Sequence, residues 1–473
     1  MTNLTGRDIC FHTMNELALM IKRLEITPSE VTEAFIQRIE KNDGLVNSYV
    51  QIFKDEAREA ARIADQSIRS NRYIGPLHGI PIALKDVFDV AGHPTTYGSK
   101  VFLNDTVQLD GSVVKRLRDS GAVILGKLNL DELAFGVTGE SSYFGPCRNP
   151  WNLERISGGS SAGAAAAVAA SFCVASVGTD AGGSVRLPAS LCGIVGLKPT
   201  YGLVSRYGAG GNNWSLDHVG PMTKTVADCA TMLQAISGPD PRDVTTLGAN
   251  AQDLTKALTT DVKGMKIGVQ KDFFYENLDK DVEIATTKAV DMLKELGANI
   301  LEISVPWARY SRSVNLVIGY CEAASNHEDN LGKRAMEYGD YVRGRLELGK
   351  FFLATHYLKA QRIRSAMTQD LVREMSKVDA IVTPTTPITA TKIGDHAVRL
   401  GERTVDPRLV ISVFTSLFNL TGFPAISIPC GFTSEGMPIG LQIAGKPFDD
   451  AIVIRVAHAY ETNTEWHKMR PPI

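Results

Sequence analysis

Three short segments bring together residue types that can do chemistry, a lysine and two serines. Lys85 ends an apolar run, and Ser160 and Ser184 each follow a pair of glycines. A serine hydroxyl becomes a good nucleophile when a neighbouring base takes its proton, and a neutral lysine can serve as that base. Gly182 and Gly183 let main-chain amides approach a substrate oxygen, as in an oxyanion hole. The combination predicts nucleophilic attack by a serine on a carbonyl group.

Taken singly, each segment has a simpler interpretation. The Gly-Gly-Ser-Ser stretch around Ser160 is typical of a turn, a helix cap or a phosphate-binding nest. A lone lysine after an apolar strand is usually a surface residue. The stretch 178–184 lacks the Gly-Lys-Ser/Thr ending of a P-loop, and neither serine lies in a G-x-S-x-G nucleophile elbow. The prediction of catalysis therefore depends on the three segments acting together.

The elements that would position these residues can be predicted from the pattern of apolar residues. Short apolar runs alternate with helical stretches, and the strand pattern returns near the C-terminus. The runs are residues 80–84, 122–126, 173–177, 379–384 and 423–432. Runs of this length are typical of strands buried on both faces. We therefore predict the α/β class, with a large mixed β-sheet core flanked by helices on both faces.

Two local patterns predict particular helices. The Thr-Pro-Ser-Glu sequence at 27–30 is a capping box that would start a packing helix. Residues 156–179 carry no charge, and their number alone would permit a membrane helix. Their content is mainly Ala, Gly and Ser, however. We expect a tightly packed internal helix at 162–171 followed by a buried strand at 173–177.

The composition limits the function classes. Among the 473 residues, 50 Lys+Arg nearly balance 52 Asp+Glu, so global charge favours neither nucleic acid nor an anionic membrane as a partner. The seven cysteines are scattered, and the nine histidines form no ligand motif, so we predict no disulfide framework, metal site or cofactor. The N-terminus has no signal-peptide pattern, and we expect a cytoplasmic protein.

We expect one domain over residues 1–473. Its predicted parts are N-terminal helices at 1–70, a catalytic core at 71–235, a charged helical cover region at 236–377 and the C-terminal part of the sheet core at 378–473. No internal repeat, low-complexity tract or long linker interrupts the sequence, which favours one large domain over separate ones.

The combination of the three segments resembles the amidase signature family of serine hydrolases. Lys85 precedes Ser160 by 75 residues, and Ser160 precedes Ser184 by 24. The resemblance extends to the sequence around these residues and resumes near the C-terminus. The similar stretches are residues 78–86, 149–163, 178–189, 196–206, 218–224, 423–432 and 436–450.

The resemblance implies roles for individual residues. Ser184 would be the nucleophile, Ser160 a bridging serine after a cis Gly159–Ser160 peptide, and Lys85 the base. The pKa of Lys85 would have to be lowered by burial for it to accept a proton. Asp180 and Arg186 would hold the turn. The oxyanion hole and substrate-binding wall would be formed by Ala181, Gly182, Gly183, Ser184, Ala134 and Phe135, without a metal. Phe135 has an equally good interpretation as a core residue.

Positions outside the triad indicate which amide is cleaved. Among the branches of the family, the sequence resembles the one that supplies the glutamine-hydrolysing subunit of aspartyl/glutamyl-tRNA amidotransferases. There an Asp binds the α-amino group of glutamine, whereas Ser412 stands at the matching position here and cannot make the same charge-assisted contact. Asn315-Leu316 replaces a Tyr-Tyr pair of that branch. Arg345 is either a partner for the substrate carboxylate or an exposed helical arginine.

These departures favour an amidohydrolase that acts on a neutral, fairly apolar amide, aryl amide or carbamate through an acyl-enzyme on Ser184. The alternative is the glutamine-hydrolysing subunit of the aspartyl/glutamyl-tRNA amidotransferase. The favoured interpretation predicts a small-molecule amide or carbamate as the partner, with no nucleic acid, no membrane and a possible homodimer.

Overall fold

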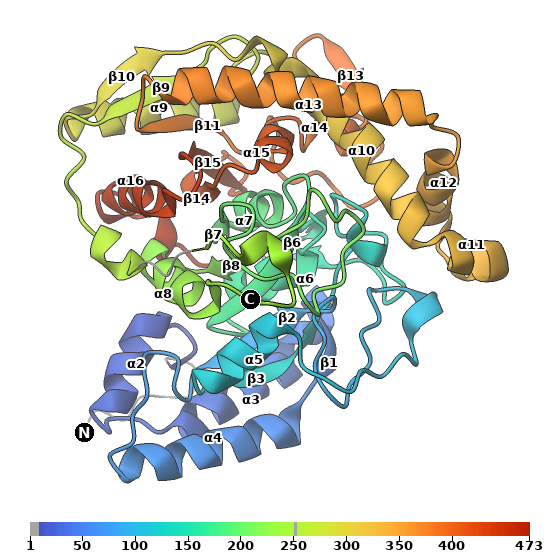
Figure 1. The fold of residues 1–473 in the computed structure, drawn as a ribbon. Helices are drawn as coiled ribbons and strands as arrows, with labels where there is room; N and C mark the ends of the chain where they lie inside the picture. Colours follow the sequence, from blue (N-terminus) through green and yellow to red (C-terminus); the bar gives the residue numbers. More distant parts are fainter. Residues whose placement is uncertain (1–8, 250–252) are drawn as a thin grey trace.

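The computed structural model describes residues 9–249 and 253–473 (Figure 1). Within them, eleven strands form one mixed sheet in the order β1-β3-β2-β6-β8-β7-β14-β15-β11-β9-β10. The strands are β1 (Tyr49–Ile52), β2 (Pro81–Lys85), β3 (Val123–Leu128), β6 (Ala175–Asp180), β7 (Val195–Lys198), β8 (His218–Thr223), β9 (Lys266–Val269), β10 (Asn299–Glu302), β11 (Ala380–Pro384), β14 (Ala425–Phe432) and β15 (Pro438–Ala444).

Helices cover the two faces and one end of this sheet (Figure 1). Helix α7 packs against β14 and β15, and α16 packs against the same two strands. The helices are α2 (Met14–Lys22), α3 (Pro28–Val46), α4 (Lys54–Arg69), α5 (Ser112–Asp119), α6 (Ala162–Ala169), α7 (Arg186–Cys192), α8 (Val226–Ile236), α9 (Lys280–Glu295), α10 (Ser311–Asn326), α11 (Glu328–Arg334), α12 (Asp340–Gly349), α13 (Ala354–Met375), α14 (Pro407–Val410), α15 (Ser416–Thr421) and α16 (Asp450–Thr462). The predicted fold class is confirmed.

The direction of three central strands brings the predicted catalytic segments together. Strand β2 pairs in parallel with both β3 and β6. The carboxyl ends of parallel neighbours meet at one edge of a sheet. Lys85, the last residue of β2, therefore lies beside the end of β6, where Thr179 and Asp180 lead into the glycine turn.

Two of the predicted local patterns are present in the structure. Thr27 caps α3, because its side chain accepts from the Glu30 amide while the Glu30 carboxylate accepts from the Thr27 amide. The uncharged stretch forms α6, in which every residue is buried, followed by strand β6. No helix in the described ranges combines the length and apolar character needed to span a bilayer.

The middle of the chain differs from the prediction of a purely helical cover. Besides α9–α13, it contributes β9 and β10, which pair in parallel and extend one edge of the sheet. Both strands are four residues long, and β10 is largely exposed. Short edge strands of this kind have no long buried apolar run, so their sequence resembles that of connecting segments.

Candidate active site

Lys85 is buried at the end of β2 and points at two hydroxyl groups. Its Nζ donates to Ser160 Oγ at 2.7 Å and to Thr179 Oγ1 at 2.8 Å. Burial lowers the pKa of the Lys85 ammonium from 10.5 to about 7, and the carboxylates of Asp217 and Asp131 oppose this shift. A lysine in this environment can be neutral near pH 7 and accept a proton.

Ser160 sits in a tightly packed loop before α6. The Gly159–Ser160 peptide is cis. The Ser160 carbonyl accepts from the Asp131 amide at 3.2 Å. The Ser161 side chain makes no capping bond to α6 and instead donates to the Thr179 carbonyl at 3.2 Å. The Ser161 amide donates to the Ser184 carbonyl at 3.2 Å, which joins the two serine segments.

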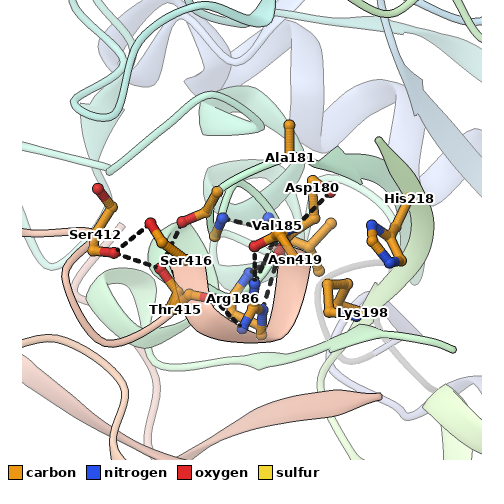
Figure 2. A network of polar contacts seen from close by, with 12 residues as sticks. Asp180, Ala181, Val185, Arg186, Lys198, His218, Ser412, Thr415, Ser416 and Asn419 are labelled. Carbon is orange, nitrogen blue, oxygen red and sulfur yellow. Dashed lines mark hydrogen bonds and ion pairs between the residues drawn. The ribbon is translucent and has the colours of Figure 1, made fainter. Parts of the chain in front are cut away.

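The turn after β6 is organised around the Asp180 carboxylate (Figure 2). Asp180 accepts from the Gly183 amide at 2.7 Å and from the Val185 amide at 3.1 Å. The Gly183 amide is therefore engaged, which argues against its predicted part in an oxyanion hole. Three other amides of the turn have no acceptor in the part of the chain that the structure describes. They are those of Ala181, Gly182 and Ser184.

Arg186 connects this turn to the C-terminal part of the chain through hydrogen bonds (Figure 2). Its side chain is fully buried and pairs with Asp180 at 2.9 Å. It also donates to Asn419 Oδ1 at 2.7 Å, Gln442 Oε1 at 2.7 Å and the Thr415 carbonyl at 3.1 Å. The nearby guanidinium holds the pKa of the Asp180 carboxyl well below its usual range. These contacts agree with the predicted holding role of Asp180 and Arg186.

Ser184 lines a small pocket beside the glycine turn. Ala134 and Phe135 line it, as do Ala181 and Gly182 of the turn. The Phe135 ring is only partly buried and packs edge-on against Tyr320 at 5.2 Å between centroids. Phe135 therefore forms a wall of the pocket rather than part of the closed core.

Several residues at the site were not predicted from sequence. Thr179 Oγ1 accepts a second hydrogen bond from the Lys85 ammonium. The Asp217 carboxylate raises the pKa of Lys85 and so opposes the effect of burial. Arg312 also lines the pocket. Arg345, by contrast, was named from the sequence with two interpretations, and the structure does not support the exposed helical one. It lines the pocket, stacks on the Tyr341 ring at 3.5 Å, and donates to Tyr320 Oη and the Phe135 carbonyl.

The residues that replace the amidotransferase pattern lie around the same pocket. Ser412 is buried and lines it, together with Asn315 and Leu316. Asn315 Nδ2 donates to the Ala181 carbonyl at 2.9 Å and so braces the turn. Across residues 9–249 and 253–473, the structure has no group of three His, Cys, Asp or Glu side chains placed to hold a metal ion.

The fold and the site define a hydrolase of the α/β class. A buried lysine, two serines and a turn with unbonded amides meet at one edge of its mixed sheet. A family model described as Amidase matches residues 30–454. The chain belongs to the amidase signature family, whose hydrolases cleave C–N bonds. The resemblance drawn from the sequence is thereby confirmed.

Individual relatives match over almost the whole chain. The A-subunit of glutamyl-tRNA(Gln) amidotransferase from Geobacter metallireducens is 44% identical, with 98% of this chain and 99% of that protein covered. The solved structure of the A-subunit from Thermotoga maritima is similar with a TM-score of 0.83, at 37% identity and 98% coverage of both chains. A second solved structure is described as an unexpected vestigial protein complex that reveals the evolutionary origins of an s-triazine catabolic enzyme. It matches with a TM-score of 0.92 at 31% identity, and the match covers 96% of this chain and 98% of that chain.

These relatives correct the predicted partners. The sequence interpretation had a small-molecule amide or carbamate, a possible homodimer and no nucleic acid. That prediction is wrong, because relatives with 44% and 43% identity are named as subunits of a glutamyl-tRNA(Gln) amidotransferase. They also support the amidotransferase alternative better than the free-standing amidase that the sequence interpretation favoured.

Proposed function

We propose that this chain is the amide-hydrolysing subunit of an amidotransferase that acts on glutamyl-tRNA, and that it cleaves a C–N bond through an acyl-enzyme on Ser184. The identity of 44% with an A-subunit over 98% of the chain supports the assignment to such an assembly. The observation that carries the chemistry is the 2.7 Å hydrogen bond from buried Lys85 to Ser160, beside Ser184 at the pocket.

In the proposed reaction, Ser184 Oγ attacks the amide carbonyl carbon and its proton passes to Ser160 Oγ. Ser160 gives its own proton to neutral Lys85 at the same time. The unbonded amides of the turn stabilise the oxyanion, and one such donor typically contributes about 2.7–4 kcal/mol. Collapse breaks the C–N bond, and the lysine proton returns through Ser160 to the nitrogen, which leaves as the amine or ammonia. Water then attacks the Ser184 ester by the same route and releases the carboxylic acid.

A free-standing amidase is a second candidate, and Ser412 favours it. The resemblance places an Asp at this position in the amidotransferase branch, where it binds the amino group of glutamine. Here a buried neutral serine lines the pocket instead. The two candidates share the proposed chemistry and differ in the acyl donor and in the need for companion subunits.

The test compares the purified chain alone with the chain mixed with companion subunits of the Geobacter metallireducens amidotransferase. We expect ammonia release and amidation of glutamyl-tRNA that require the mixture and are lost in Ser184→Ala. Ser190→Ala is the matched control, because Ser190 lies on the next helix and its buried Oγ has no partner among the described residues. Hydrolysis of a chromogenic anilide by the chain alone, with no response to the companions or tRNA, would instead establish the free-standing amidase.

The role of Ser184 can be tested without knowing the substrate. A neutral fluorophosphonate should label the peptide that contains Ser184 in the unmodified chain. Stoichiometric labelling of Ser160, with Ser184 unmodified, would reverse the assigned roles of the two serines.

A further inference from the structure

The segment 131–137, which we call the wall segment, contributes to two pockets. Ala134 and Phe135 line the pocket beside Ser184. Leu133 lines a second small pocket, whose other residues include several polar side chains of the helical cover region. The wall segment therefore connects the surface that a substrate would contact with side chains that lie away from the reaction.

The wall segment also contacts the loop of the bridging serine. The Asp131 amide donates to the Ser160 carbonyl at 3.2 Å, and the Gly159 amide donates to the Val137 carbonyl at 2.9 Å. These two hydrogen bonds lie at opposite ends of the wall segment. A shift of the wall segment would therefore change both the surface of the pocket and the position of Ser160.

Two consecutive residues of the wall segment have an unfavourable backbone conformation. Leu133 has a φ of +54° and Ala134 a φ of +55°. Both residues have a β-carbon, which clashes with the neighbouring carbonyl oxygen in this left-handed region. Such a conformation persists only where the surrounding structure holds it. The wall segment therefore depends on hydrogen bonds from other parts of the chain.

A chain of three side chains supplies one of these hydrogen bonds. Asn212 Nδ2 donates to the Leu133 carbonyl. His327 Nε2 lies 2.7 Å from Asn212 Oδ1, and Tyr338 Oη lies 3.4 Å from His327 Nδ1. Asn212 and Tyr338 are buried. His327 lies where α10 ends and α11 begins, so the chain runs from the helical cover region to the pocket wall.

The chemistry of these groups fixes the direction of every hydrogen bond. The Leu133 carbonyl can only accept, so the Asn212 atom beside it is the amide nitrogen and the other atom is the oxygen. That oxygen can only accept, so His327 carries its proton on Nε2. Burial lowers the pKa of His327 to about 4, so its ring is neutral at pH 7 and Nδ1 accepts from the Tyr338 hydroxyl. A single arrangement of protons therefore satisfies the whole chain.

We propose that Asn212 and His327 are positioning residues for the reaction at Ser184. Asn212 holds the strained wall segment in place, and His327 orients the Asn212 amide. Neither residue lines the pocket beside Ser184, so both act through the wall segment. The proposal rests on the proposed acyl-enzyme, and it applies to the amidotransferase subunit and to the free-standing amidase alike.

Labelling of Ser184 by a neutral fluorophosphonate measures the effect on the reaction. Asn212→Leu removes the donor to the wall segment, and His327→Leu removes the donor that orients Asn212. We expect the second-order rate constant of labelling to fall at least tenfold in each variant. His327→Gln should react within threefold of the unmodified protein, because the glutamine Nε2 can donate to the same oxygen. Asn330→Leu is the control, since Asn330 lines the second pocket without belonging to the chain of hydrogen bonds.

The pH profile of labelling separates positioning from an effect on the base. The pKa of Lys85 is about 7, and the rate should level off near that pH in the unmodified protein. In Asn212→Leu and His327→Leu the break should stay at the same pH while the plateau falls, and labelling should still reach one equivalent per chain. A break that moves by one pH unit or more, or a rate within threefold of the unmodified protein in both leucine variants, would overturn the proposal.

Hydrogen exchange tests the wall segment without any reaction. Its amides at 133–135 donate to main-chain carbonyls, so they exchange when the segment opens. The peptide that contains them should exchange at least tenfold faster in Asn212→Leu and His327→Leu, and at the normal rate in His327→Gln and Asn330→Leu. If Ser184 is not labelled in the unmodified protein, the proposed function fails, and exchange still decides whether the chain of hydrogen bonds holds the wall segment. Unchanged exchange in Asn212→Leu would overturn the proposal.

Discussion

The charge of Lys85 should control how fast Ser184 reacts. Burial lowers the pKa of this lysine from 10.5 to about 7, and only the neutral amine can take a proton. Two pH units below the pKa about 1% of the lysines are neutral, so the reaction at pH 5 should be roughly a hundredfold slower than on the plateau above pH 8. A lysine that kept its usual pKa would be about 5 kcal/mol harder to deprotonate, and the rate would still rise at pH 10.

The assay is the rate of inactivation by a neutral fluorophosphonate between pH 5 and pH 10, which does not depend on the substrate. The logarithm of the rate should rise with unit slope and level off near pH 7. Lys85→Arg should react slowly at every pH, because a guanidinium stays charged. Asp217→Asn removes the carboxylate that most strongly raises the pKa of Lys85, so the break should move to lower pH by up to about one unit.

Two results would refute this reasoning. One is a break above pH 9 in the unmodified protein, which would mean that burial does not lower the pKa of the reactive base. The other is a near-normal rate for Lys85→Arg, which would mean that the base lies elsewhere.

Three further outcomes are expected. Asp180→Asn leaves the buried Arg186 guanidinium without its counter-charge, so the free energy of unfolding in urea should fall by about 3–5 kcal/mol; a loss below about 1 kcal/mol would contradict the holding role. Gly183→Ala would place a Cβ 2.3 Å from Thr415 Oγ1 at a φ of +132°, so labelling of Ser184 should slow at least tenfold, and an unchanged rate would mean that the turn can relax. Dialysis against a strong chelator should leave activity unchanged, and a tenfold loss restored by Zn²⁺ would contradict the metal-free mechanism.

The helices and strands that could be predicted from the sequence are those with a capping motif or an apolar run of their own. The Thr27 capping box starts α3 at Pro28, and the apolar run before Lys85 forms β2. Strands β9 and β10 could not. Strand β9 pairs with β11, which lies far along the chain, and β10 pairs with β9 at the edge of the sheet. Nothing in their own composition distinguishes them from loops.

The residues of the candidate site also differ in whether the sequence alone could identify them. Lys85, Ser160 and Ser184 stand in glycine-rich or strand-end segments whose residue types already indicate chemistry. Arg312 stands in a helix of ordinary polar composition, and only the packing of α10 beside the glycine turn brings it to the pocket. Its own sequence neighbourhood carries no motif that could have identified it, whereas Arg345 was named through the resemblance.

Two of the hydrogen-bond partners of Arg186 are synthesised long after Arg186 itself. The ribosome makes β6 and the glycine turn well before Asn419 and Gln442, the neutral partners that the buried guanidinium needs. A nascent chain that ends before those residues carries both serines and the lysine, yet its guanidinium lacks these two side-chain acceptors. Domains fold as units as the chain emerges. We therefore expect the glycine turn to be held in its final form only after Asn419 and Gln442 have been synthesised.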